Sequence, residues 1–150
     1  MTLRIRCLAG CGFLLLLPSL CFCSDWPQWR GPDRDGRIAD APKTWPEELD
    51  QSWQVEVGEG HSSPVIVGKY AYIFTRQADN EVVRRLELGT GKVVWSKKYP
   101  VQYQIHSAAR GHGKGPKSTP VVAEGKLVTL GISGVLSCYR TDDGQQPPLS

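Results

Sequence analysis

The stretch SSPVIVGKYAYIF at residues 62–74 indicates a repeated β-structure, because the chain contains the same pattern again as STPVVAEGKLVTL at residues 118–130. The two stretches align without a gap at an offset of 56 residues. Each holds two short apolar runs separated by a turn that contains Gly68 or Gly125. Such runs predict antiparallel hairpins, and consecutive apolar residues indicate strands that are buried on both faces.

More strands are expected after each hairpin. In the first copy the alternation and the turn signals predict four strands, at residues 64–67, 70–75, 81–88 and 92–96. In the second copy they predict three strands, at residues 119–123, 126–130 and 135–140. The turn at 142–144 matches the turn at 89–91, now at an offset of 53. No window shows a sustained helical period, so we expect little helix.

A unit of four antiparallel strands that repeats at this spacing is typical of β-propeller blades. One blade leaves both of its faces in water, and so blades must stack. We therefore predict an all-β chain that forms a partial β-propeller of about two four-stranded antiparallel blades. Its open edges and uncovered face predict that the isolated chain is oligomeric or poorly soluble.

The segment RLELGTGKVVW at residues 85–95 resembles the tryptophan-docking repeat of the pyrroloquinoline-quinone (PQQ)-like β-propellers. The resemblance assigns blade-docking roles to five residues: Glu87, Thr90, Gly91, Lys92 and Trp95. Arg85 departs from the small residue that is usual in that family. The glycine permits a tight turn, and the tryptophan ring can pack between neighbouring blades. In the second copy only Gly144 and the turn character survive.

The likeness extends to DWPQWRGPDRDG, VGEGHSSP and GKGPKSTPVV, which resemble secreted bacterial proteins of the quinoprotein alcohol dehydrogenase-like group. It implies that residues 62–97 are a first blade and 118–144 a truncated second blade, within an incomplete propeller over 52–150. It further implies that residues 52–57 are a strand that closes the last blade. The chain would then be an N-terminal fragment, and the missing C-terminal blades would be its partners.

Residues 1–23 have the layout of a secretory signal peptide. They carry Arg4 and Arg6, no acidic residue, and a short apolar core before the small residue Cys23. We expect a signal helix and export to the periplasm or the extracellular space; the alternative is a lipid anchor on Cys23. The apolar core is too short for a membrane span, so none is expected after signal cleavage.

The mature chain is expected to start with an irregular Pro- and Trp-rich arm at residues 24–51, in which Trp26, Trp29 and Trp45 pin the arm to a bulkier surface. Removing the leader leaves 16 basic and 15 acidic residues, a formal charge of +1, which gives no reason to expect nucleic-acid binding. Only Cys138 remains outside the leader, and we expect it to be a small buried apolar residue.

GHGKGPKS at residues 111–118 is close to a phosphate-binding loop, but Pro116 replaces its second glycine and the motif precedes a strand. We interpret it as a loop between blades; the alternative places it on the top face, where a site could gather His61, His106, His112, Lys114 and Lys117. The three histidines lack the short ligand spacing of zinc sites. No catalytic constellation and no cofactor site is evident, so whether the chain is an enzyme stays open, with the balance toward no.

Three functions stay open at this stage. The first is an exported, non-enzymatic scaffold or protein-interaction module akin to outer-membrane assembly lipoproteins, with other exported polypeptides as partners. The second is the N-terminal part of a PQQ-dependent alcohol dehydrogenase-like oxidoreductase, which would use PQQ and calcium. The third is a truncated product with no independent function.

Overall fold

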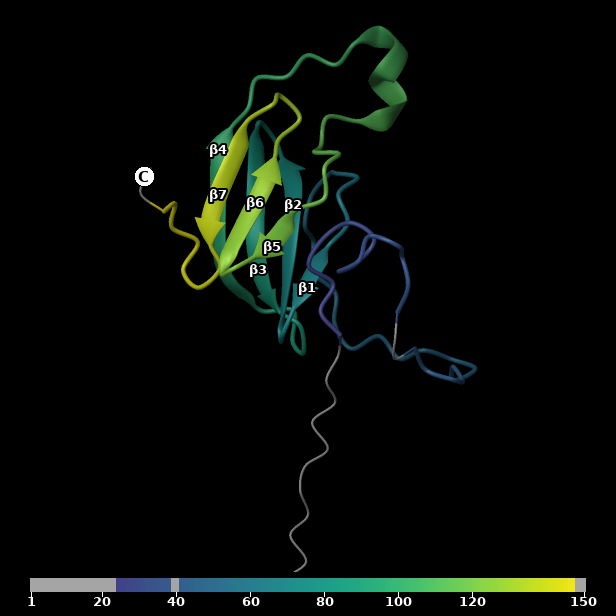
Figure 1. Ribbon diagram of the computed structural model, residues 1–150. Helices are drawn as coiled ribbons and strands as arrows, with labels where there is room; N and C mark the ends of the chain where they lie inside the picture. Colours follow the sequence, from purple (N-terminus) through teal and green to yellow (C-terminus); the bar gives the residue numbers. More distant parts are fainter. Residues whose placement is uncertain (1–23, 39–40, 148–150) are drawn as a thin grey trace, which may run out of the picture.

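The computed structural model describes residues 24–38 and 41–147, which contain two antiparallel sheets (Figure 1). The first sheet has the order β1-β2-β3-β4, with β1 Val65–Val67, β2 Tyr70–Gln77, β3 Asn80–Glu87 and β4 Val93–Pro100. The second has the order β5-β6-β7, with β5 Val121–Ala123, β6 Lys126–Leu130 and β7 Leu136–Arg140. The prediction of an all-β chain with two blade-like antiparallel sheets is confirmed.

The only helix among the described residues is a 3₁₀ turn, η1 Ser107–His112, in the connection between the sheets. No helix in this part of the chain is long and apolar enough to cross a membrane. The signal peptide and its expected helix lie outside the described residues.

The two sheets share their turns as well as their strands. The first turn residue of each first hairpin has a positive φ, Gly68 at 56° and its equivalent Glu124 at 50°. The Leu88 N–H donates to Lys69 O and the Thr141 N–H donates to Gly125 O, both at 2.8 Å. These bonds occupy equivalent positions of the two copies, at the offsets of 53 and 56 read from the sequence. The repeated sequence therefore specifies a repeated backbone.

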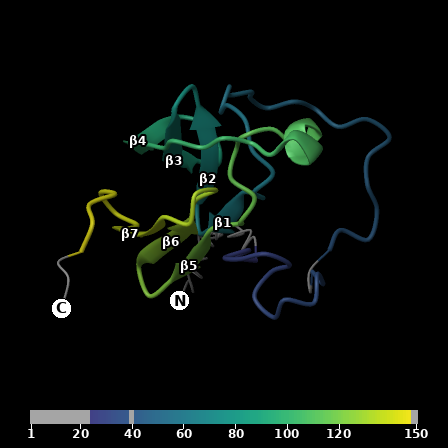
Figure 2. The same cartoon turned by 90° about the horizontal axis from the view of Figure 1, so that it is seen from above.

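The core lies between the sheets, which stack as neighbouring layers (Figure 2). It consists of Val65, Tyr72, Phe74, Val83 and Trp95 from the first sheet and Val122, Leu127 and Tyr139 from the second. Side chains alternate between the two faces of a strand. Hence Ala71, Val82 and Leu86, which are also buried, lie on the opposite face of the first sheet.

That opposite face is in contact with residues 52–57, the SWQVEV segment. The Thr75 hydroxyl donates to Val57 O at 2.5 Å, and Arg84 Nη1 donates to Glu56 O at 2.9 Å. The segment is extended, but it forms no ladder with any described strand; the first backbone bridge comes after it, between Glu59 and Arg76. Its expected role as a strand of another blade stays a prediction.

The N-terminal arm joins the inner strands of both sheets. Trp26 forms an antiparallel bridge with Ile66 of β1, and the Val122 N–H of β5 donates to Pro27 O at 2.8 Å. The backbone at Trp26 and Pro27 therefore attaches the arm to both sheets. The prediction that tryptophan rings pin the arm is wrong for Trp29 and Trp45, which are 61% and 70% exposed.

Candidate functional site

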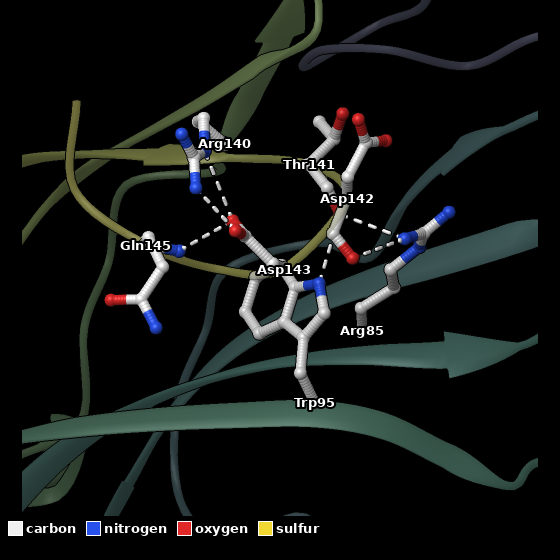
Figure 3. A network of polar contacts seen from close by, with 7 residues as sticks. All are labelled: Arg85, Trp95, Arg140, Thr141, Asp142, Asp143 and Gln145. Atoms are coloured by element: carbon white, nitrogen blue, oxygen red, sulfur yellow. Dashed lines mark hydrogen bonds and ion pairs between the residues drawn. The ribbon is translucent and has the colours of Figure 1, made fainter.

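Trp95 of β4 is the central residue of the contact between the sheets (Figure 3). Its ring is 9% exposed and lies between Tyr72 and Tyr139, with centroid distances of 6.2 and 6.4 Å. Its Nε1–H donates to Thr141 O at 2.8 Å. The indole thus combines apolar burial with one satisfied hydrogen bond, which is how a buried tryptophan contributes most.

Gly144 receives the flat side of that indole. A Cβ at this position would lie 2.9 Å from Cδ2 and Cε3 of Trp95, and the residue has a φ of +68°. Any other residue would be strained by its backbone and would also collide with the ring. Gly144 and Trp95 therefore act as one docking unit.

Arg85 of β3 is a further bridge to the second sheet, and the sequence marked it only as a departure. Its Nη1 donates to Thr141 O at 2.9 Å and to Asp142 O at 3.0 Å, and its guanidinium lies 3.4 Å from the ring centroid of Tyr70. Arg85 is the register partner of Trp95. This register is the signal that could have found it, because residues directly opposite on paired strands share a face.

The other motif residues build the turn that follows β3. The Thr90 hydroxyl donates to Glu87 Oε2 at 2.8 Å and accepts from the Lys92 N–H at 3.2 Å, while the Lys92 side chain is exposed. Gly91 closes the turn with a φ of 70° and a bond from its N–H to Glu87 O at 2.8 Å. These four residues fix the turn on which the contact depends.

The second copy builds the same turn with different chemistry. Arg140 and Asp143 form a two-pronged ion pair at the positions of Glu87 and Thr90, and the Gln145 N–H donates to Asp143 Oδ1 at 3.0 Å. The Arg140 side chain and that backbone N–H lower the pKa of Asp143 to about 2. The turn is thus conserved in shape although its sequence differs.

Trp53 repeats the docking contact on the other face of the first sheet. Its Nε1–H donates to Leu88 O at 2.8 Å, and a Cβ on Gly91 would lie 2.6 Å from its ring. Leu88 and Gly91 correspond to Thr141 and Gly144 at the offset of 53. The 52–57 segment therefore docks its tryptophan on the first sheet in the same way as β4 docks Trp95 on the second sheet.

A buried carboxylate adds a polar contact between the sheets. Glu81 is fully buried; its Oε1 accepts from the Ile132 N–H at 2.7 Å and its Oε2 accepts from the Tyr99 hydroxyl at 2.5 Å. Burial raises the pKa of Tyr99, and the bond to Glu81 raises it further. Sequence reasoning missed this pair, since nothing local marks Glu81 as buried.

The five residues expected on a top-face loop are only partly brought together. His61 Nε2 lies 2.8 Å from His112 O, and Lys117 Nζ donates to the same carbonyl. His106 instead caps η1 by accepting from the Ala108 N–H, and Lys114 is exposed in the loop beyond. With Lys117 held by its own loop, this stretch does not resemble a phosphate cradle.

The enzyme alternative would require a calcium site beside the quinone, and it stays a prediction. Calcium takes six to eight oxygen ligands in proteins. No group of three or more His, Cys, Asp or Glu side chains that could hold a metal occurs in the described part of the chain. We derive no chemical step through these groups.

A hollow of about 510 Å³ lies beside the free edge of β7 and faces β4. It is lined by Lys97, Lys98, Tyr99, Val135, Ser137, Tyr139, Gly144, Gln145 and Gln146. The hollow is thus bounded by both sheets at the point where the second sheet lacks a fourth strand among the described residues.

Neither a family model nor a curated protein matches the chain. Among solved structures, the crystal structure of BamB from Moraxella catarrhalis is similar, at 22% identity and a TM-score of 0.44. The match covers 63% of this chain and 29% of that one, so the chain spans less than a third of the length of BamB.

Proposed function

We propose that the chain is an exported, non-enzymatic interaction module of the PQQ-like β-propeller type, which binds polypeptides on the outer face and free edge of its second sheet. Export would place it in the periplasm or outside the cell, with a lipid on Cys23 as the variant form. The docking of a tryptophan on a turn glycine, present twice, supports the PQQ-like assignment.

The observation that carries the proposal is the character of this outer face. Its apolar members are Val121, Val128, Leu130, Leu136 and Cys138, and Leu136 is 71% exposed. At the repeat offsets they correspond, in that order, to Val65, Tyr72, Phe74, Val83 and Arg85 of the first sheet. All five of those residues are buried against the second sheet. The outer face of the second sheet is thus equivalent to the face of the first sheet that the second sheet covers.

The edge of β7 could also bind a polypeptide, through backbone hydrogen bonds to an added strand. Among the described residues β7 pairs only with β6, and on its other side only its last residue makes backbone bonds: the Arg140 N–H donates to Gln145 O at 2.8 Å, and Arg140 O accepts from the Gly144 N–H at 3.0 Å. Free N–H and C=O groups on an edge can accept an added strand, with the backbone bonds providing affinity and the side-chain pattern providing specificity.

A synthetic peptide of residues 92–100, KVVWSKKYP, tests the proposal. It copies β4, and β4 pairs with the strand that corresponds to β7. We expect it to slow amide hydrogen exchange over β7. The matched control carries Lys97→Pro, which removes a backbone donor that faces the partner strand and should abolish the protection. If neither peptide protects β7, the proposed binding surface is wrong.

A further inference from the structure

We propose that the polypeptide bound at this surface is a second copy of the same chain, whose 52–57 segment adds to the free edge of β7 as the fourth strand of the second sheet. The inference rests on the proposed function and names its partner. Assembly would be head-to-tail, because the donating segment and the accepting edge lie at different places on the molecule.

The first argument is the equivalence of Trp53 and Trp95. Each indole donates from Nε1 at 2.8 Å to the corresponding carbonyl, Leu88 O or Thr141 O, and each lies against the corresponding turn glycine. Trp95 makes this contact from a strand that pairs with β3. Trp53 makes it from an extended segment without a ladder. The segment already holds the position of a fourth strand and has no sheet of its own in the described structure.

The second argument is the register that the repeat imposes. Arg85 pairs with Trp95, and Arg85 corresponds to Cys138 at the offset of 53. A segment added in the same register pairs Trp53 with Cys138. The following antiparallel pairs are then Gln54 with Ser137, Val55 with Leu136, and Glu56 with Val135. Trp53 and Val55 would thus lie on the apolar outer face, with Val55 beside the most exposed leucine of that face.

The third argument is charge. In this register Gln54 and Glu56 point to the other side, into the hollow that Lys97 and Lys98 line. Glu56 is the only acidic residue among the four paired positions 53–56, and its side chain is exposed. Opposite charges at a contact select the partner and its orientation.

The 52–57 segment can join another molecule and still keep its contacts with its own first sheet. In one molecule the 52–57 segment stays on the outer face of the first sheet through Trp53 and Val57. When that segment joins the second sheet of another molecule, its own first sheet is carried onto that molecule's exposed outer face. One contact therefore covers both the free edge and the apolar face, and it leaves a donor and an acceptor at the two ends of the assembly.

Substitutions at two exposed residues test the donating segment and the accepting edge separately. Glu56→Lys places a like charge against the lysines and impairs donation, whereas Leu136→Glu places a charge opposite Val55 and impairs acceptance. Glu48→Lys is the matched control, since it makes the same charge change outside the paired residues. Circular dichroism melting checks that every variant folds.

The chain, produced from its full sequence, is measured by analytical ultracentrifugation over a range of concentrations. We expect the wild type and Glu48→Lys to form assemblies larger than dimers, and each of the other variants alone to associate at least about tenfold more weakly. A one-to-one mixture of Glu56→Lys with Leu136→Glu retains one intact donor and one intact acceptor, so it should stop at the dimer.

A wild type that stays monomeric at every soluble concentration would overturn the inference, as would a symmetric dimer or variants that assemble like the wild type. Each of these results can occur while the peptide of residues 92–100 still protects β7. In that case the proposed function survives and only the identity of the partner fails. Loss of peptide binding would instead remove the proposed function itself.

Discussion

Gly144→Ala tests whether the fit between Trp95 and a turn glycine holds the two sheets together. The added Cβ would lie 2.9 Å from the indole, at a backbone φ of +68°. Placing an L-residue in the left-handed region costs roughly 1–2 kcal/mol. Forcing an extra carbon into a packed contact costs roughly 1–3 kcal/mol more. The free energy of unfolding should therefore fall by about 2–5 kcal/mol, the sum of these two costs.

Gly134→Ala is the matched control. Gly134 also has a positive φ, +86°, but a Cβ there would meet no atom within 4 Å. This variant should lose only the backbone cost of about 1–2 kcal/mol. Gly91→Ala extends the comparison to the first sheet, since its Cβ would lie 2.6 Å from Trp53. It should resemble Gly144→Ala if the 52–57 segment is docked as strongly as β4.

The assay is equilibrium unfolding in urea, followed by tryptophan fluorescence and far-ultraviolet circular dichroism. All variants are compared at one protein concentration, because association would stabilise the folded state by mass action. If Gly144→Ala loses no more stability than Gly134→Ala, the packing of Trp95 on the turn contributes nothing, and the reasoning about this contact is refuted.

Three further predictions concern polar groups at the same contact. Arg85→Lys should lower the free energy of unfolding by about 1.5–3 kcal/mol, because an ammonium cannot both stack on a ring and reach two carbonyls as a guanidinium does; an unchanged urea midpoint would contradict this. The carboxyl of Asp143 should titrate near pH 2 by NMR and move up toward about 4 in Arg140→Gln. Since its pKa is lowered by folding, its contribution to stability is present above pH 4 and is lost as the pH falls toward 2. A shared midpoint in both proteins would show that the ion pair does not form. Because the pKa of Tyr99 is raised by folding, its contribution to stability is present below about pH 10 and is lost above it. In Tyr99→Phe the free energy of unfolding should therefore fall less steeply as the pH rises above about 10. The same pH dependence in both proteins would show that Tyr99 makes no such contribution.

Local sequence patterns were enough to predict the strands of both sheets and the turns between them. Each apolar run between glycine turns forms a strand, because local alternation and the positive φ at Gly68, Gly91, Gly125 and Gly144 are properties of short segments. The repeat also determined that the two sheets share one backbone pattern. These features need no knowledge of what lies on either side of a sheet.

The residues that join the two sheets became known from the three-dimensional structure. Arg85 looked like a departure from a motif, yet it bonds to two carbonyls that lie 56 and 57 residues away in the chain. Glu81 is buried because the loop at Ile132 closes over it, whereas Trp29 and Trp45 stay 61% and 70% exposed, with the Arg30 guanidinium over the ring of Trp29. Contacts across long separations depend on how the sheets stack, which local patterns do not encode.

In the 52–57 segment the sequence pattern and the observed structure differ. Its alternation predicts a strand, and its tryptophan resembles the one in β4. Yet it forms no ladder among the described residues, because a strand exists only beside a partner. Local alternation indicates that this segment can pair. The tertiary structure places its tryptophan ring on the first sheet, where Glu56 O and Val57 O accept bonds from Arg84 and Thr75.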